Sequence, residues 1–395
     1  MKYILVFAGS RSQYNFFRRL SQPLIRLEYG IIYLVVKPSL VFRAKRDGAI
    51  CILVSNSSSV SVSDELAQTT EVASKDVPVE IAAKFFNAVL ENALECLRAY
   101  PISIAFIWNG HSIPSRALTK FAQTHTLQTL YFELSNIPGK IFVDKAGVNA
   151  GSSLLKNPEQ LDSYRVEGTD YERWKEAYLA RARNQLLSQT AREKASVTNF
   201  LFPLDSLGTW FNLPRIGEMK LFNKIRQKLF RRNTWISYDD INLTSPLYLF
   251  FPMQVSNDSQ LLFNSDVGLG EALDMASRRS EELQIDLIIK PHPLEESESV
   301  ARQLSEIRKR RRTFIVNAPT LRLIEDCSEV MTINSTVGLE AMILGKPVTF
   351  LGRSFYRSFD SDRMEKYVMR HLIDIDYFGN EEVSVETMKE VLSRI

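Results

Sequence analysis

A chain of 395 residues is longer than one typical hydrophobic core can organise, so two domains are expected. Apolar residues make up 45% and charged residues 24%, a globular composition, and a net charge of +3 argues against a general nucleic-acid-binding protein. Three widely spaced cysteines (Cys51, Cys96 and Cys327) indicate buried thiols in a reducing compartment. Because no signal peptide or membrane-spanning run is visible, we expect a cytoplasmic protein, with peripheral membrane contact left open.

Strand-like and helix-like segments alternate through the first part of the chain. Apolar runs predict strands at residues 3–7, 31–36, 49–54, 102–107 and 127–132. Residues 79–100 have apolar side chains at helical spacing, and the serine-rich residues 55–63 are typical of a loop. From about Ser152 to Asp240 the sequence is polar, helical in pattern and rich in arginine and lysine, which indicates a connection with an inserted helical region.

A second alternating series follows this connection. Its strands are expected at residues 247–251, 286–289, 313–316, 330–333 and 348–351, with helices between them. Strand–helix–strand units at this spacing predict a parallel sheet with right-handed crossovers. The fold class is therefore α/β, with two Rossmann-like lobes facing a central cleft, as in the GT-B architecture. In such sheets ligands bind at the carboxyl ends of the strands.

Small hydroxyl residues follow the apolar run 330–333, at the point where a helix should begin. In Asn334-Ser335-Thr336, the backbone N–H groups and the dipole of the following helix favour an anion, typically a phosphate. Glu340 lies four residues beyond Thr336, where its carboxylate can accept hydrogen bonds from ribose hydroxyls. An ordinary N-capped helix explains the same residues, since serine and threonine are common caps.

Lys290-Pro291-His292-Pro293 directly follows the predicted strand 286–289. The two prolines restrict the backbone on either side of His292 and so fix the direction of its imidazole. A histidine that titrates near neutrality suits phosphate binding or proton donation to a leaving phosphate. The alternative is a loop histidine that is hydrogen-bonded to backbone.

Polar residues follow other predicted strands as well. They are Gln254 and Asp258 in the second series, and Asn109, His111, Glu133 and Asn136 in the first. Asp258 and Glu133 are the candidate ligand-facing carboxylates, with a capping or surface role as the alternative. For His111 the alternative is a solvated loop histidine. Four histidines without close pairing, and no convincing Asp-x-Asp at a strand end, argue against a metal-dependent site.

Two stretches are strongly basic. Residues 220–232 combine an apolar stripe with lysines and arginines, so they suit either an anionic membrane surface or packing against the protein itself. Residues 308–312 end a predicted helix, where cations complement the helix dipole.

Taken in order, these segments resemble the capsule polysaccharide biosynthesis family, whose characterised members are bacterial β-Kdo glycosyltransferases (Kdo is 3-deoxy-D-manno-oct-2-ulosonic acid). The matching segments are Trp108-Asn109-Gly110, Phe132-Glu133 with Pro138, Asp144 with Gly147-Val148-Asn149, Gln254-Val255 with Asp258, Lys290-Pro291-His292-Pro293, Asn334 to Ala341, and Gly345-Lys346-Pro347-Val348 with Gly352 and Phe355-Tyr356. They span about residues 108–356. Some relatives carry two catalytic modules where this chain has one, and the first 100 residues match no family motif.

The resemblance implies a CMP-Kdo donor, no metal or other cofactor, and a GT-B-like fold. It implies that Asp258 is the nucleophile of a double displacement that retains the β configuration, with Glu133 as acid/base and His292 at the phosphate. The implied donor-binding residues are Gln254, Lys290, His292, Asn334, Ser335, Thr336 and Glu340. The acceptor-side candidates are Asn109, His111, Asn136 and Asn149.

The lobes are assigned accordingly. Residues 1–155 form the acceptor-side lobe, 156–244 the helical connection, 245–358 the CMP-sugar lobe and 359–395 the C-terminal helices. The expected acceptor is a capsule lipid linker or an O-antigen glycan, and residues 220–232 are the expected contact with the cytoplasmic face of the inner membrane. No nucleic-acid partner is expected.

Two other functions fit parts of the pattern. A UDP-sugar-dependent transferase or a nucleotide-sugar epimerase would keep the phosphate turn and Glu340 but prefer uridine nucleotides. A non-catalytic assembly protein on the membrane surface would depend on the basic helix and tolerate replacement of Asp258 and His292.

Overall fold

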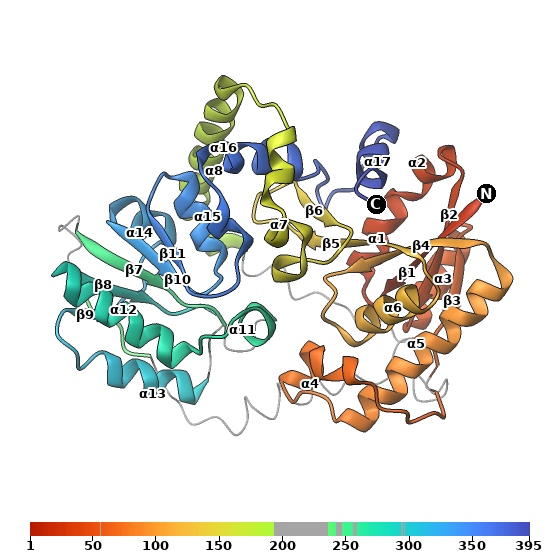
Figure 1. Ribbon diagram of the computed structural model, residues 1–395, viewed down its shortest axis with the longest axis horizontal. Coiled ribbons are helices and arrows are strands. Elements are labelled where there is room, and N and C mark those ends of the chain that lie inside the picture. The colour runs from red at the N-terminus through yellow and green to blue at the C-terminus, as the bar shows by residue number, and fades with distance from the viewer. Residues whose placement is uncertain (56, 193–235, 242–246, 256–258, 294, 296) are drawn as a thin grey trace. The chain divides into compact units, whose positions relative to one another are not determined.

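The computed structural model describes residues 1–55, 57–192, 236–241, 247–255, 259–293, 295 and 297–395 (Figure 1). Two compact units are present. The first contains Met1–Ser153 and His371–Ile395, and the second contains the described parts of Leu154–Thr198 and Arg231–Arg370. Asp258 and the basic residues 220–232 lie outside the described residues.

The first unit is built on a six-stranded sheet. Its strands are β1 (Lys2–Ala8), β2 (Tyr29–Val35), β3 (Ile50–Leu53), β4 (Ile102–Trp108), β5 (Gln128–Leu134) and β6 (Ile141–Asp144). They are ordered β3-β2-β1-β4-β5-β6, and β6 is antiparallel to β5 while the other neighbours are parallel. The five predicted strands are confirmed. The antiparallel edge strand β6 was not predicted, because it has only four residues and follows β5 without an intervening helix.

Helices cover both faces of this sheet. They are α1 (Arg11–Arg19), α2 (Ser21–Arg26), α3 (Pro38–Arg46), α4 (Thr70–Ala73), α5 (Val79–Ala99), α6 (Ile113–Thr124) and, near the C-terminus, α17 (Val385–Leu392). Residues 55–63 form no helix or strand where they are described, as predicted. The chain returns to this unit at its end, because Ile373 and Ile375 lie in the same buried cluster as Phe16 and Phe132.

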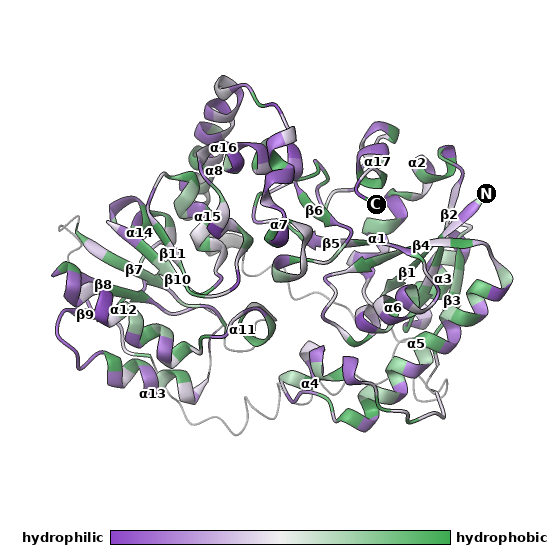
Figure 2. Cartoon of the chain, viewed as in Figure 1, coloured by the Kyte–Doolittle hydropathy of each residue, from purple (hydrophilic) through white to green (hydrophobic). Residues whose placement is uncertain are grey.

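In Figure 2 the strands of the first unit are mainly green, whereas α5 alternates green and purple along its length. This difference follows from burial. Strands of a parallel sheet are covered on both faces and so are apolar throughout, while a surface helix buries a single stripe. In α5 that stripe includes Ala82, Phe85, Phe86 and Val89, all of which are buried.

The second unit has a five-stranded parallel sheet. Its strands are β7 (Tyr248–Pro252), β8 (Asp286–Lys290), β9 (Thr313–Ile315), β10 (Glu329–Thr332) and β11 (Val348–Phe350), ordered β11-β10-β7-β8-β9. All five were predicted. Two buried clusters flank the sheet. One includes Leu273 of α12 (Leu269–Leu283) and Leu304 of α13 (Glu298–Ile307), and the other includes Ile324 of α14 (Thr320–Asp326) and Ala341 of α15 (Thr336–Ile343).

The remaining described α-helices of the second unit are α8 (Gly168–Arg192), α11 (Ser259–Asn264) and α16 (Ser361–Lys366). The short α7 (Ser153–Lys156) begins with the last residue of the segment Met1–Ser153 and continues into the second unit along the chain. In the part of the chain described here, no helix is both long and apolar enough to cross a membrane.

Both sheets are doubly wound. In the first, the chain runs outward from β1 to β3 and then crosses to β4 on the other side of β1; in the second, it runs from β7 to β9 and crosses to β10. These two crossing points are the topological switch points at which Rossmann-like sheets bind ligands. The α/β class with two Rossmann-like lobes is therefore confirmed.

Candidate functional site

Three polar segments lie at the topological switch point of the second unit. They follow β7 at Gln254, end β8 at Lys290 and follow β10 at Asn334. Because β7 lies between β8 and β10 in the sheet, the carboxyl ends of these strands are neighbours. The predicted donor residues thus converge on one edge of one sheet.

The segments after β7 and β10 are joined by hydrogen bonds. The backbone N–H of Asn334 donates to Gln254 Oε1 over 2.9 Å, and Asn334 Nδ2 donates to the carbonyl of Asn264 over 2.7 Å. Both Gln254 and Asn334 are buried, at 7% and 8% exposure. Their side chains are engaged with the protein itself, so they position the turn that precedes α15.

Gly352 makes room for this arrangement. A Cβ at this position would lie 2.4 Å from Asn334 Nδ2, closer than any side chain can tolerate. The backbone N–H of Gly352 donates to the carbonyl of Ile333 over 3.0 Å, which fixes the segment after β11 against the turn. Glycine is therefore required by a close approach of side chain and backbone.

The N-terminus of α15 is capped by its own serine. Ser335 Oγ accepts a hydrogen bond from the N–H of Val337 over 3.2 Å, and the N–H of Ser335 donates to Thr332 Oγ1 over 3.3 Å. Ser335 is buried, whereas Thr336 is exposed. The capping role that the sequence left open for Ser335 is present, and Thr336 carries the hydroxyl that is accessible to a ligand at the positive end of the helix dipole.

Lys290 and Glu340 form the charged part of the site. Burial raises the pKa of Glu340 to about 7, and the nearby Lys290 ammonium partly opposes this rise. Burial lowers the pKa of Lys290, and the Glu340 carboxylate opposes that shift. Lys290 Nζ also donates to Thr320 Oγ1 over 2.7 Å. An ammonium and a carboxylate are thus held near each other in a partly dehydrated place, where each can bind a polar ligand strongly.

A row of aromatic side chains on α8 extends toward this charged pair. The rings of Tyr171 and Trp174 stack with centroids 5.7 Å apart, and those of Trp174 and Tyr178 stack at 5.2 Å. The Glu340 carboxylate contributes to raising the pKa of Tyr178, after the larger effect of burial. These residues were missed by the sequence reasoning, although their spacing (three and then four residues) places them on one helical face.

His292 lies just beyond β8, partly buried, after the buried Pro291. Its carbonyl accepts a hydrogen bond from the N–H of Glu295 over 2.9 Å. The proline before it and this backbone bond after it hold the local chain. That the imidazole contacts a phosphate stays a prediction.

In the first unit, Asn109 and Glu133 are brought together at the ends of β4 and β5. Asn109 Nδ2 donates to Glu133 Oε2 over 2.5 Å. Asn109 has a φ of +62°, a left-handed conformation that asparagine tolerates better than most residues. Burial raises the pKa of Tyr377 to about 12, and the Glu133 carboxylate adds a smaller contribution to this rise. Tyr377 comes from the C-terminal segment and was not identified from the sequence.

The other acceptor-side candidates are His111, Asn136 and Asn149. Burial and the positive charge of Arg116 lower the pKa of His111 to about 4, so its imidazole is neutral at pH 7. Asn136 lies in the turn between β5 and β6, and Asn149 begins a 3-10 turn over Asn149–Gly151. The buried Asp144 accepts hydrogen bonds from Ala146, Gly147 and Ser153, so it holds this turn.

In the basic residues 308–312, which follow α13, several side chains form ion pairs with neighbouring carboxylates. Arg308 pairs with Asp239, Lys309 with Glu306 and Arg310 with Asp274. A solvated surface of paired charges accounts for this run. Among the described residues, no group of three or more His, Cys, Asp or Glu side chains is placed to hold a metal ion.

Several known proteins are similar to this chain. Protein FixF of Sinorhizobium fredii is 32% identical over 115 residues, 28% of each chain, and the capsule polysaccharide export protein KpsS of Escherichia coli is 28% identical over 120 residues, 28% of this chain and 31% of KpsS. Each match therefore covers less than a third of the relative's length.

Among solved structures, the β-Kdo 2,4 transferase of Thermosulfurimonas dismutans KpsC is 14% identical, with a TM-score of 0.45 over 98% of this chain and 97% of that one. The β-Kdo 2,7 transferase of the same KpsC is 17% identical, with a TM-score of 0.40 over 77% and 88%. The model of the family described as capsule polysaccharide biosynthesis protein matches residues 105–359, well over half of the chain. The chain belongs to the capsule polysaccharide biosynthesis protein family.

Proposed function

We propose that this protein is a β-Kdo glycosyltransferase that moves Kdo from CMP-Kdo to a bacterial surface-polysaccharide acceptor with retention of configuration. The observation that carries the proposal is the family match over residues 105–359, which includes both strand-end sites. The charged and capped edge of the second sheet supports it, because that edge has the chemistry that a nucleoside monophosphate requires.

In this proposal the second unit binds the donor. The N-terminus of α15, with the Thr336 hydroxyl and the imidazole of His292, binds the CMP phosphate. Glu340 accepts hydrogen bonds from the ribose hydroxyls, and Lys290 offsets the negative charge of the donor. Gln254, Asn334 and Ser335 act indirectly, since their polar atoms hold the turn in place. No metal is needed in this scheme, because the charge of the phosphate is balanced by protein groups.

Transfer proceeds by double displacement. The carboxylate of Asp258 attacks the anomeric carbon of Kdo as the bond to the phosphate oxygen breaks, so CMP leaves and a glycosyl-enzyme forms. An acceptor hydroxyl then attacks the same carbon, the bond to Asp258 breaks, and the acceptor proton passes to Glu133. Two inversions give the retained β linkage. The Asn109 amide, hydrogen-bonded to Glu133, orients that carboxylate.

The acceptor is a glycan or glycolipid, either the lipid linker of a capsule or an O-antigen chain. In the lipid case the basic residues 220–232, whose sequence predicts an amphipathic helix, bring the protein to the cytoplasmic face of the inner membrane, because such a helix binds anionic lipids.

The test begins with thermal shifts induced by CMP, UMP, UDP, GDP and ADP, followed by transfer assays with CMP-Kdo generated in situ. We expect a shift with CMP and none of comparable size with UDP. A shift with UDP alone would favour the UDP-sugar transferase or epimerase, and the absence of any shift would contradict an enzyme that uses nucleotide sugars.

Asp258→Asn tests the chemistry separately from binding. We expect this variant to lose transfer while keeping the CMP shift. Asp266→Asn is the matched control, because Asp266 lies nearby in sequence and its side chain is 77% exposed. Full transfer by Asp258→Asn would remove Asp258 from the mechanism.

A further inference from the structure

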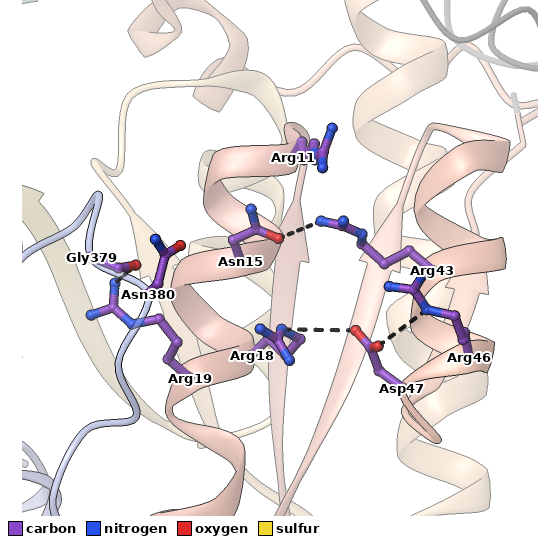
Figure 3. Close-up of a pocket in the computed structure, with 9 residues that line it drawn as sticks. All are labelled: Arg11, Asn15, Arg18, Arg19, Arg43, Arg46, Asp47, Gly379 and Asn380. Carbon is purple, nitrogen blue, oxygen red and sulfur yellow. Dashed lines mark hydrogen bonds and ion pairs between the residues drawn. The ribbon is translucent and has the colours of Figure 1, made fainter.

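A groove on the first unit is lined by five arginines. Arg11, Arg18 and Arg19 come from α1, and Arg43 and Arg46 come from α3 (Figure 3). The remaining lining residues are Asn15, Asp47, Gly379 and Asn380, and the cavity measures about 230 Å³. None of these residues belongs to the strand-end pair Asn109 and Glu133.

The groove carries a large excess of positive charge. Asp47 is the one acidic residue among the nine that line it, and its carboxylate lies 3.8 Å from both Arg18 Nε and Arg46 Nε. The same carboxylate accepts a hydrogen bond from the Tyr14 hydroxyl over 3.0 Å. One lining carboxylate is therefore shared among several donors, and the other carboxylates that act on Arg19, those of Asp376 and Glu381, do not line the groove.

Arg43 is partly dehydrated and surrounded by other arginines. It is partly buried, and its Nη1 donates to the neutral Asn15 Oδ1 over 2.8 Å. Burial lowers its pKa, the neighbouring charges of Arg11 and Arg46 lower it further, and the Asp47 carboxylate opposes only part of this shift. Bringing like charges together in this way has an energetic cost that a bound anion would remove.

Helix ends account for only part of the cluster. Arg18 and Arg19 lie in the last turn of α1, and Arg43 and Arg46 lie in the last turn of α3, where cations are favoured by the helix dipole. Arg11 is different, because it is the first residue of α1 and thus lies at the positive end of that dipole. The helix dipole disfavours a cation there, so helix ends do not account for Arg11.

One wall of the groove is held rigidly by Arg19. This side chain is buried, and its Nη1 donates to the carbonyls of Asp376 over 2.7 Å and Gly379 over 2.5 Å. The segment that carries Gly379 and Asn380 is therefore fixed against α1. The groove is formed before any ligand arrives, which lowers the entropic cost of binding.

We propose that this groove binds a phosphate group. Guanidinium groups approach it from two helices, and a tetrahedral phosphate presents oxygens in several directions, whereas a carboxylate has only two coplanar oxygens. The planar fork of arginine matches phosphate geometry and remains charged in a partly buried place. The phosphate belongs either to a soluble phosphorylated compound or to a lipid headgroup.

The first experiment measures binding of inorganic phosphate and pyrophosphate by calorimetry at constant ionic strength, with chloride as the reference anion. The test variant is Arg11→Gln/Arg43→Gln, and the control is Arg278→Gln/Arg311→Gln, which removes two exposed arginines from the second unit. We expect binding to weaken at least about tenfold in the test variant and to be unchanged in the control. Equal binding by both variants and the wild type would overturn the proposal.

A further variant separates this site from the nucleotide site. Lys290→Met should leave the phosphate-binding event that depends on Arg11 and Arg43 intact, whatever its effect on CMP. Arg43→Lys keeps the charge but loses the fork, so it should fold normally and bind phosphate with intermediate affinity. Circular dichroism checks the fold of each variant, and loss of binding by Lys290→Met together with retention by the double variant would contradict the assignment.

Vesicles identify the source of the phosphate. Sedimentation with phosphatidylglycerol-containing vesicles, but not with phosphatidylcholine alone, and its loss in the double variant would assign the groove to lipid headgroups. Phe42 on α3, which is 69% exposed, should then contribute, and Phe42→Ala should weaken sedimentation. Phosphate binding without sedimentation would assign the groove to a soluble compound. Absence of both responses in the wild type would refute the proposal.

Discussion

The N–H of Asn334 donates to the side-chain oxygen of Gln254 over 2.9 Å, and this bond ties the ends of β7 and β10 together. Both residues are buried, so no solvent replaces the bond when it is lost. The turn that begins α15 thus depends on a residue 80 positions earlier in the chain. The geometry of the switch point is set by a side chain that need not touch the ligand.

Gln254→Met should lower the free energy of unfolding by about 1–3 kcal/mol, because it leaves a buried N–H without an acceptor while keeping the side-chain volume. Urea denaturation of the variant and the wild type measures the difference. Gln254→Ala should be at least as damaging, since it also leaves a cavity. A methionine variant as stable as the wild type would show that the hydrogen bond contributes little.

Glu340→Gln should change how stability depends on pH. The folded pKa of about 7 lies above the unfolded value of 4.5, so the favourable contribution of Glu340 is complete below pH 4.5 and is lost as the pH rises to 7. The neutral variant should therefore be more stable than the wild type at pH 8, by about 1–3 kcal/mol, and equally stable at pH 4.

Denaturation across pH 4 to 8 measures this difference. Glu282→Gln is the control, since the Glu282 side chain is 68% exposed. Burial also lowers the pKa of His111 to about 4 and of His371 to about 3. Their contribution to stability has the opposite pH dependence, because it is present at neutral pH and is lost as the pH falls. Both histidines are present in every variant, so their effect cancels in the difference. A pH-independent difference for Glu340→Gln would contradict the assignment.

The sequence predicted the strands well because each is a run of apolar residues long enough to be buried on both faces. It also placed Gln254, Lys290 and Asn334 at strand ends, and strand order then brings them together. It could not predict that the Gln254 and Ser335 oxygens are used within the protein, because that depends on distances of a few ångströms. Burial was predicted for all three thiols; it is confirmed for Cys96 and Cys327, whereas Cys51 is only partly buried.

The arginine groove could not be predicted from the sequence either. Arg11 and Arg43 are 32 residues apart, and Gly379 is far away in sequence, so no local pattern signals that they share a surface. Likewise, Tyr377 approaches Glu133 only because the C-terminal segment packs on the first unit. Such groupings arise from topology and not from spacing along the chain.

Asn109 offers a test of backbone strain. Its φ of +62° suits glycine and asparagine, whereas a Cβ without a polar group is disfavoured there. Asn109→Ala and Asn109→Gly both lose the hydrogen bond to Glu133, but alanine also adds strain. The free energy of unfolding of Asn109→Ala should therefore be lower than that of Asn109→Gly by about 1 kcal/mol, as measured by urea denaturation. Equal stability would show that the conformation relaxes.

Gly338→Ala should destabilise the second unit and weaken its response to CMP. A Cβ at Gly338 would lie 2.4 Å from the Phe350 ring, so α15 must move away from β11 and carry its N-terminus with it. The expected loss is about 1–3 kcal/mol, measured by denaturation, with a smaller thermal shift at saturating CMP.

Gly270→Ala is the matched control, because the nearest neighbour of a Cβ there, Gln303 Nε2, is 3.9 Å away. Removing a helical glycine without a clash should raise stability by up to about 1 kcal/mol, so the same substitution has opposite signs at the two sites. Phe350→Leu should partly restore Gly338→Ala, since a smaller side chain gives α15 room to return. If both glycine variants change stability in the same direction, close packing of α15 on β11 does not control this end of the sheet.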